Sequence, residues 1–237
     1  MKKIFKSFLL LLLFTSCYRI NEINERLLLH RIQYDNSTKD TLENNVTLEF
    51  ENNRAFGKSF VNIYSTNYFL GNISSIDFKD LSSTRMAGSP YENELESKFF
   101  SILRGNRRFR RTNKNEFEIY NDKNEILSFI NITNKTDLDK RTFVLESDKR
   151  FSISFEEDNV YGTLPVNSYF GRYTIKNNII QLKDIATTLM ASNDLDMKME
   201  NIYLEYLNKP YVVSLYKDKL IIFDNNKTYL FIEKKDN

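Results

Sequence analysis

Few residues of this sequence combine a type and a spacing that could carry out chemistry. His30 is the only histidine and lies in an apolar segment, so a metal site built from several histidines is not available. The sequence contains no HExxH motif, cysteine cluster, GxSxG elbow, P-loop or GxGxxG turn. We therefore expect no metal, no cofactor and no catalytic residue, and interpret His30 as a structural residue.

Acidic side chains are abundant, but they form one close cluster only, Glu156, Glu157 and Asp158. These three residues fall in the turn of an expected hairpin, where solvation accounts for them. Two carboxylates distant in sequence can still meet in a fold, as glycoside hydrolysis requires, and this alternative stays open.

The single cysteine, Cys17, ends a segment typical of an export signal. The segment starts with lysines, and its apolar run over 8–14 is shorter than the ~20 residues that span a bilayer. The residues before Cys17 resemble a bacterial lipobox, whose cysteine thiol carries diacylglycerol through a thioether. We predict a signal peptide over 1–16 and a lipidated tether over 17–25, held stably at a membrane by acyl chains. No second cysteine is present, so no intrachain disulfide can form.

Removal of the export signal changes the charge balance. The whole chain has a net charge of +2, but loss of three N-terminal lysines leaves 31 basic against 32 acidic side chains, a net charge of −1. Hydrophobic residues make up 41% of the chain, which is enough for packed cores and argues against intrinsic disorder. A near-neutral mature chain gives no reason to expect a nucleic-acid partner.

One short segment concentrates positive charge around Phe109. Its five arginines are Arg104, Arg107, Arg108, Arg110 and Arg111. The segment lies where we expect a connection between a helix and a hairpin, so a solvated loop is the simplest interpretation. The alternative is contact with an anionic envelope lipid or glycolipid, which a lipid anchor would bring close.

The strongest pattern is an internal duplication. Residues 48–57 (LEFENNRAFG) match residues 153–162 (ISFEEDNVYG), 105 positions later. With two one-residue slips, the match continues in order to residues 117–127 and 220–230. Along it, Glu96 and Phe99 correspond to Glu200 and Tyr203. The agreement in order and spacing indicates two copies of one module.

Each copy has the periodicity of several strands and one helix. Strands are expected at equivalent places: 27–32, 46–50 and 73–81 in the first copy, and 141–145, 151–155 and 179–185 in the second. After the Met-Ala pairs the apolar spacing becomes helical, and Ser89 and Asn193 are suitable N-caps. Hairpins over 116–130 and 219–233 close the copies. One helix on an antiparallel sheet predicts an α+β module.

Together these residues resemble the META domain family of HslJ-like proteins. The motif residues are Asn62, Tyr64, Thr84, Arg85, Met86 and Ala87 in the first copy, and Asn167, Tyr169, Thr188, Met190 and Ala191 in the second. The resemblance implies two tandem barrel-like modules over 26–132 and 141–235, with a linker over 133–140. In the family a cysteine usually precedes the asparagine and another follows Met-Ala. Here those places hold Val61 and Gly88, or Val166 and Ser192.

The motif residues have a structural and a functional interpretation. In the structural one, the asparagines bond turn backbone, the tyrosines line the barrel wall, and Met86 and Met190 pack the helix onto the sheet. In the functional one, Asn62 and Asn167 with the tyrosines that follow them form a ligand site. We favour the structural interpretation, because fold-holding residues would also recur in both copies.

The resemblance implies no established catalytic activity; members are commonly secreted or envelope proteins, some linked to stress. We therefore expect a non-catalytic envelope lipoprotein that binds a partner or supports the envelope under stress. Tyr18 after the cysteine favours the outer over the inner membrane. The alternative is a small-ligand-binding or hydrolytic protein with a site in a cleft between the modules.

Overall fold

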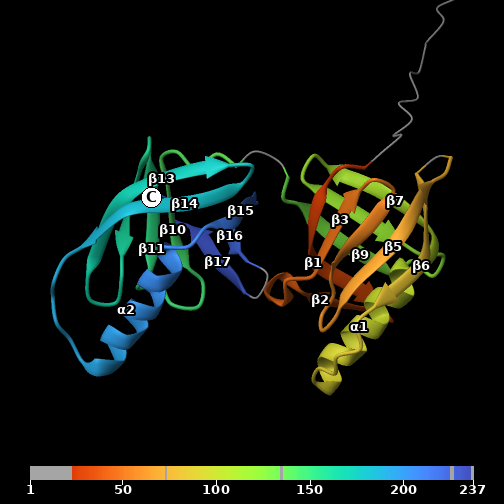
Figure 1. The fold of residues 1–237 in the computed structure, drawn as a ribbon, viewed down its shortest axis with the longest axis horizontal. Helices are drawn as coiled ribbons and strands as arrows, with labels where there is room; N and C mark the ends of the chain where they lie inside the picture. Colours follow the sequence, from red (N-terminus) through yellow and green to blue (C-terminus); the bar gives the residue numbers. More distant parts are fainter. Residues whose placement is uncertain (1–22, 73, 134–135, 225–226, 236–237) are drawn as a thin grey trace, which may run out of the picture.

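Two antiparallel β-barrels follow one another along the chain, each with one α-helix (Figure 1). The computed structural model describes residues 23–72, 74–133, 136–224 and 227–235. The predicted fold class, two tandem barrel-like α+β modules, is confirmed. The predicted signal peptide and Cys17 lie outside the described residues.

The first barrel is closed because β1 pairs with both β3 and β9. Its strands, in order around the barrel, are β1 (Arg26–Tyr34), β3 (Thr47–Glu51), β4 (Arg54–Lys58), β5 (Ile63–Leu70), β6 (Ser75–Ser83), β7 (Gly105–Asn113), β8 (Glu116–Tyr120) and β9 (Ile126–Asn131). A short strand, β2 (Ser37–Asp40), pairs with the end of β1, and a turn of 3-10 helix, η1 (Leu42–Asn44), follows it. The helix α1 (Pro90–Leu103) connects β6 to β7 and contacts β8 and β9.

The second barrel repeats this order without the β2 hairpin. Its strands are β10 (Arg141–Leu145), β11 (Ser152–Glu156), β12 (Asn159–Thr163), β13 (Ser168–Lys176), β14 (Ile179–Thr187), β15 (Tyr211–Tyr216), β16 (Lys219–Phe223) and β17 (Thr228–Glu233). Pairing of β10 with β17 closes it, and α2 (Asp194–Leu207) connects β14 to β15. The same connections in the same order are what a duplicated module requires.

Each barrel encloses its own apolar core. In the first, the Phe50 ring lies against three other rings, and its centroid is 5.0 Å from that of Tyr68. In the second, Phe155 packs against Phe143 and Tyr173. Aromatic pairs of this kind contribute about 0.5–1.5 kcal/mol beyond the burial of their area.

Both helices begin where the sequence predicts. The Ser89 hydroxyl accepts from the Glu92 backbone N–H at 3.2 Å while the Glu92 carboxylate accepts from the Ser89 N–H at 2.8 Å, which is a complete capping box. The Asn193 side chain accepts from the Asp196 N–H at 3.0 Å. These caps satisfy backbone donors that a helix leaves without partners at its N-terminus.

The arginine-rich segment does not form a loop, so this prediction is wrong. Most of it is strand β7, which pairs with β6 and β8. Phe109 points into the barrel and is buried, whereas its neighbours Arg108 and Arg110 are exposed. The strand therefore has the alternation of a half-buried strand, but one phenylalanine among arginines gave too little apolar pattern to predict it.

The two modules pack on each other through an apolar cluster of buried side chains. It joins Leu28, Leu42, Ile130 and Ile132 of the first module to Tyr216, Ile221, Phe223 and Leu230 of the second. Asn45 adds hydrogen bonds across the junction, accepting from the Thr228 hydroxyl and donating to the Asp224 carbonyl at 3.3 Å. The outer faces of β1 and β9 are thus covered by the second module.

Candidate functional site

The asparagine of the family motif is buried in both modules, and its side-chain amide makes hydrogen bonds through both the oxygen and the nitrogen. The Asn62 Oδ1 atom accepts from the Thr84 hydroxyl and from the Met86 N–H, both at 2.7 Å. Its Nδ2 atom donates to Glu96 Oε2 at 2.6 Å and to the Met86 carbonyl at 3.2 Å. An amide can make these four bonds and no more. Asn62 therefore joins β5, the segment after β6 and α1.

The second module repeats this network atom for atom. Asn167 accepts from the Thr188 hydroxyl at 2.8 Å and the Met190 N–H at 2.7 Å, and donates to Glu200 Oε1 at 2.6 Å. Its second amide hydrogen goes to the Met190 carbonyl at 3.2 Å. Nothing of either asparagine is left to bind a ligand, so the structural interpretation of Asn62 and Asn167 holds.

Glu96 and Glu200, which the sequence analysis did not single out, are the partners that complete these networks. Both are buried on the helices. Glu96 also accepts from the Ser59 hydroxyl and from the N–H groups of Val61 and Asn62 at 3.0 and 2.8 Å. Burial opposes ionisation of Glu96, but these hydrogen bonds outweigh it and hold its pKa below the ordinary value. The recurrence of glutamate at this place in both copies was the available clue.

The motif tyrosines also have equivalent structural roles. The Tyr64 hydroxyl donates to the Thr47 carbonyl at 2.7 Å, and the Tyr169 hydroxyl donates to the Ser152 carbonyl at 2.9 Å. A Cβ atom at Gly57 would lie 2.1 Å from the same Thr47 oxygen, so only glycine fits there. These tyrosines stand on the barrel wall, as predicted.

The motif methionines do not pack the helix onto the sheet, and this prediction is wrong. Met86 and Met190 are each 56% exposed, and Arg85, Ala87 and Ala191 are exposed as well. The asparagine amide holds the backbone of the methionine, not its side chain. The segment is therefore fixed by main-chain hydrogen bonds while its side chains face solvent.

The arginines around Phe109 have separate roles. Arg107 donates to the Ser101 carbonyl at 3.0 Å and to the Ile102 carbonyl, and so caps the C-terminus of α1. Arg110 lies 2.7 Å from Glu118 Oε2, and Arg111 lies 2.7 Å from Glu25 Oε1. Arg104 and Arg108 are exposed.

The junction between the modules gathers titratable side chains. The His30 ring lies 5.0 Å from the Tyr216 ring, and both approach Glu116, which accepts from the Tyr216 hydroxyl. Burial and the charge of Arg31 lower the pKa of His30 to about 4, so its imidazole is neutral at pH 7. Beside this group lies a cavity that Asp40, Lys217 and Asp218 help to line.

The carboxylates at the junction are already engaged. Glu116 Oε2 accepts from Thr112 and Asn113, each at 2.8 Å, in addition to the bond from Tyr216 to its other oxygen. Glu118 faces Arg31 and Arg110 and accepts from Ser128 at 3.3 Å. The cleft holds converging carboxylates, but they act as acceptors in structural pairs.

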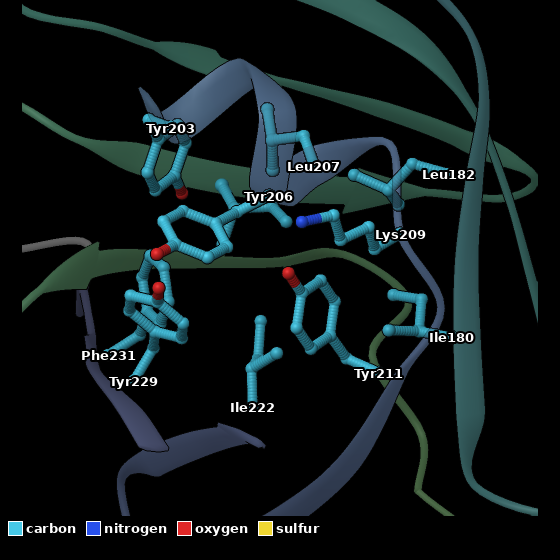
Figure 2. Close-up of a pocket in the computed structure, with 11 residues that line it drawn as sticks. Ile180, Leu182, Tyr203, Tyr206, Leu207, Lys209, Tyr211, Ile222, Tyr229 and Phe231 are labelled. Atoms are coloured by element: carbon cyan, nitrogen blue, oxygen red, sulfur yellow. The ribbon is translucent and has the colours of Figure 1, made fainter. Parts of the chain in front are cut away.

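A second pocket, which the sequence analysis missed, opens at the C-terminal end of α2 (Figure 2). Tyr203 and Tyr206 reach it from α2, Tyr211 from β15 and Tyr229 from β17, and Lys209 follows the helix. Their polar ends point toward one another in Figure 2. Only closure of the barrel brings these elements together, so no local pattern could have predicted the pocket.

Within the described ranges, no group of three or more His, Cys, Asp or Glu side chains could hold a metal ion. No helix of these residues is both long and apolar enough to span a bilayer. Ile23, the first described residue, is buried against the first core.

Comparison with known proteins finds a family model that matches two successive regions, which together make up most of the chain. The META domain model matches residues 25–134 and again residues 137–236. Curated proteins gave no match. One similar solved structure is an NMR structure of a protein from Burkholderia xenovorans, with 19% identity over 42% of this chain and 85% of that chain, and a TM-score of 0.37. A second NMR structure has 22% identity over 40% of this chain and 90% of that chain, with a TM-score of 0.34.

Proposed function

Since this chain belongs to the META domain family and contains two tandem copies of the domain, we propose that it is a lipid-anchored, non-catalytic binding protein of the bacterial cell envelope. In this proposal Cys17 carries the lipid and the first module lies against the anionic face of the membrane. The second module is then presented away from the anchor. The outer membrane is the proposed location, because Tyr18 follows the cysteine.

The observation that carries the proposal is where the chain joins the first module. Ile23 is buried, so at most about 20 Å of extended chain separates it from Cys17. Two residues later, Glu25 pairs with Arg111 at the end of β7. A lipid on Cys17 would therefore hold the arginine strand close to a membrane surface.

The outward arginines suit such a surface. Arg104, Arg108 and Arg110 are exposed, and Arg110 lies beside Glu118. A basic side chain near an anionic leaflet contributes about 1 kcal/mol of binding, and this contribution decays within about a Debye length, ~8 Å. The short chain between Cys17 and the first module and the exposed guanidinium groups together support contact with lipid or glycolipid phosphate.

A hydrolytic site in the cleft between the modules has less support. Glu116 and Glu118 each accept from several donors of the protein itself. A catalytic pair needs one carboxyl group available to protonate a substrate and one available to attack or activate water. We therefore favour the binding function over the hydrolytic one.

The anchor is tested by mass spectrometry of the protein isolated from membranes. The proposal expects cleavage before Cys17 and a diacylglyceryl thioether on it, with Cys17→Ser found uncleaved and without lipid. An unmodified, uncleaved N-terminus in the wild type would contradict the proposal.

The surface contact is tested by flotation with vesicles that contain anionic lipid. The variant Arg104→Ser/Arg108→Ser should bind about thirtyfold more weakly, since two contacts of about 1 kcal/mol are lost. The control Arg172→Ser/Lys183→Ser removes the same charge from exposed positions of the second module and should bind like wild type. Equal binding by all three proteins would contradict the contact.

A further inference from the structure

The tyrosine pocket of the second module contains buried hydroxyl groups whose hydrogen-bonding neighbours are at most other tyrosines. Tyr203 and Tyr211 are 7% and 6% exposed. The Tyr211 hydroxyl makes no hydrogen bond with the described residues, and the Tyr203 hydroxyl has only that of Tyr169 beside it. The Tyr229 hydroxyl has only that of Tyr206 beside it. Nearby Tyr169 gives its own hydrogen to the Ser152 carbonyl. A buried hydroxyl that bonds no other part of the fold gives up its hydrogen bonds to water, so several phenols of this kind in one pocket need an explanation.

The first module has none of these hydroxyl groups at the equivalent places. Strand pairing sets Ile76 opposite Arg107 in one module and Ile180 opposite Tyr211 in the other, so Tyr211 takes the place of Arg107. The Arg107 guanidinium fills that place in the first module and bonds the end of α1.

The other three tyrosines replace apolar residues. On the helix, Tyr203 and Tyr206 occupy the places of Phe99 and Ile102. Strand pairing sets Ile119 opposite Leu127 in the first barrel and Ile222 opposite Tyr229 in the second, so Tyr229 takes the place of Leu127. All four changes from the first module to the second bring a phenol to the same pocket. The fold itself does not require them, because the first module folds without them.

The charges around the pocket select the ligand. The Lys209 ammonium lies 5.5 Å from the centre of the Tyr206 ring, and the Lys227 ammonium lies 4.7 Å from that of Tyr229. Asp224 is the acidic group nearby, and its carboxylate accepts from the Lys227 N–H at 2.8 Å. Two cations beside hydroxyl donors favour an anionic acceptor and oppose a cationic ligand.

The donors stay protonated at physiological pH. Burial, followed by the charge of Asp224 and the neighbouring Tyr206, raises the pKa of Tyr211 to about 12. The hydroxyl of Tyr211 is therefore available to donate a hydrogen bond to a bound anion over the whole physiological range.

The size and walls of the pocket limit the ligand further. The free space between the side chains is about 30 Å³, which holds two or three water-sized groups. The rest of the lining is apolar, from Ile153, Ile180, Leu182, Leu207, Ile222 and Phe231. A planar head with two oxygen acceptors fits this space, and an apolar body matches the walls and the opening beside Tyr206.

We propose that this pocket binds a small organic carboxylate with an apolar body. The carboxylate oxygens accept hydrogen bonds from the Tyr203 and Tyr211 hydroxyls, with the Lys209 ammonium at the opening. The apolar part lies along Leu207 and Ile222. This site goes beyond the proposed membrane contact and does not depend on it.

The test uses equilibrium dialysis of the full-length protein in non-ionic detergent with radiolabelled butyrate. Saturable binding is expected, and the variant Tyr203→Phe/Tyr211→Phe should bind at least tenfold more weakly, since hydrogen bonds to a charged group are lost. This variant keeps both rings and removes only hydroxyls that bond no backbone group of the described residues, so it should fold. Tyr161→Phe is the matched control, because Tyr161 is exposed on β12, and it should bind like wild type.

Two further measurements separate the alternatives. Tyr211→Arg copies the first module and should abolish butyrate binding by filling the pocket. Butyramide and butylammonium, a neutral and a cationic analogue, should compete at least tenfold less well than unlabelled butyrate. Absence of saturable binding, equal binding by the double phenylalanine variant, or equal competition by either analogue would each overturn the proposal. None of these outcomes depends on the lipid anchor.

Discussion

The two modules of this protein share a polar framework and differ at the end of the helix. Asn62 with Glu96 and Asn167 with Glu200 make the same asparagine–glutamate hydrogen bond to the helix. At the other end of the helix, Arg107 closes the first module with bonds to helix carbonyls. In the second module the corresponding residue is Tyr211, whose hydroxyl has no such bond.

This difference indicates which part of the duplicated module is needed to fold and which part can change. A buried asparagine and glutamate that satisfy one another cannot be replaced singly without leaving a buried polar group unpaired. The helix C-terminus has no such constraint, since solvent or a side chain can satisfy its carbonyls. The helix end is therefore one place where the two modules could diverge without loss of the shared framework.

The largest effect is expected from removal of the buried carboxylate. Glu96→Ala leaves the Val61 N–H and one Nδ2 hydrogen of Asn62 without an acceptor and removes the bonds from Ser59 and the Asn62 N–H, so it should lower the free energy of unfolding by about 3–5 kcal/mol. Glu200→Ala should cost less, because Leu164 stands where the first module has Ser59. Urea unfolding measures both losses, and hydrogen exchange of backbone amides assigns each loss to its module.

Glu96→Gln is the control for this comparison. It keeps one acceptor oxygen and the side-chain volume, and should lose less stability than Glu96→Ala. Equal costs for Glu96→Ala and Glu200→Ala would contradict the role given to Ser59, and a negligible cost for both would contradict the framework itself.

The second largest effect is a pH dependence at the junction, where only the first module contributes a histidine. The pKa of His30 is lowered to about 4 in the folded protein from 6.5, chiefly by burial. The unfolded chain therefore takes up this proton first as the pH falls. Stability should be constant above pH 6.5 and decrease by about 3 kcal/mol between pH 6.5 and 4.

The variant His30→Leu isolates this contribution. It cannot titrate, so its unfolding free energy should change little from pH 6.5 to 4.5. Below that range Glu96 and Glu116 also contribute to a loss of stability. Their pKa values are lowered in the folded state, so the unfolded chain binds their protons first as the pH falls. An unchanged slope in His30→Leu between pH 6.5 and 4.5 would show that His30 is not the group responsible.

The sequence was enough to predict the duplication, the hairpins and both helix caps. These depend on local periodicity and on residues a few positions apart, such as Ser89 and Glu92. It was not enough to place Glu96, since a glutamate in a helix is usually solvated and its burial depends on Asn62 from another strand. Met86 was misplaced for the converse reason: the residue type suggested a core, while the contact that fixes it involves its backbone.

The third effect concerns the helix end of the first module. Arg107→Ala removes charged donors from two carbonyls of α1 and should lower the free energy of unfolding by about 2 kcal/mol. Arg108→Ala, one residue away on the exposed face, should change it by less than about 0.5 kcal/mol. Equal losses of stability in Arg107→Ala and Arg108→Ala, measured by thermal and urea unfolding, would contradict the capping role of Arg107.

The smallest effect has the opposite sign and belongs to the second module. Tyr211→Phe removes a buried hydroxyl that has no acceptor, so the variant should be more stable by about 1 kcal/mol. Tyr64→Phe removes a buried hydroxyl that donates to the Thr47 carbonyl, and should be less stable by about the same amount. The same chemical change would then stabilise one module and destabilise the other. If Tyr211→Phe instead destabilises the protein in urea unfolding, its hydroxyl has a partner and is kept for the fold, and the second module has no donor reserved for a ligand at that position.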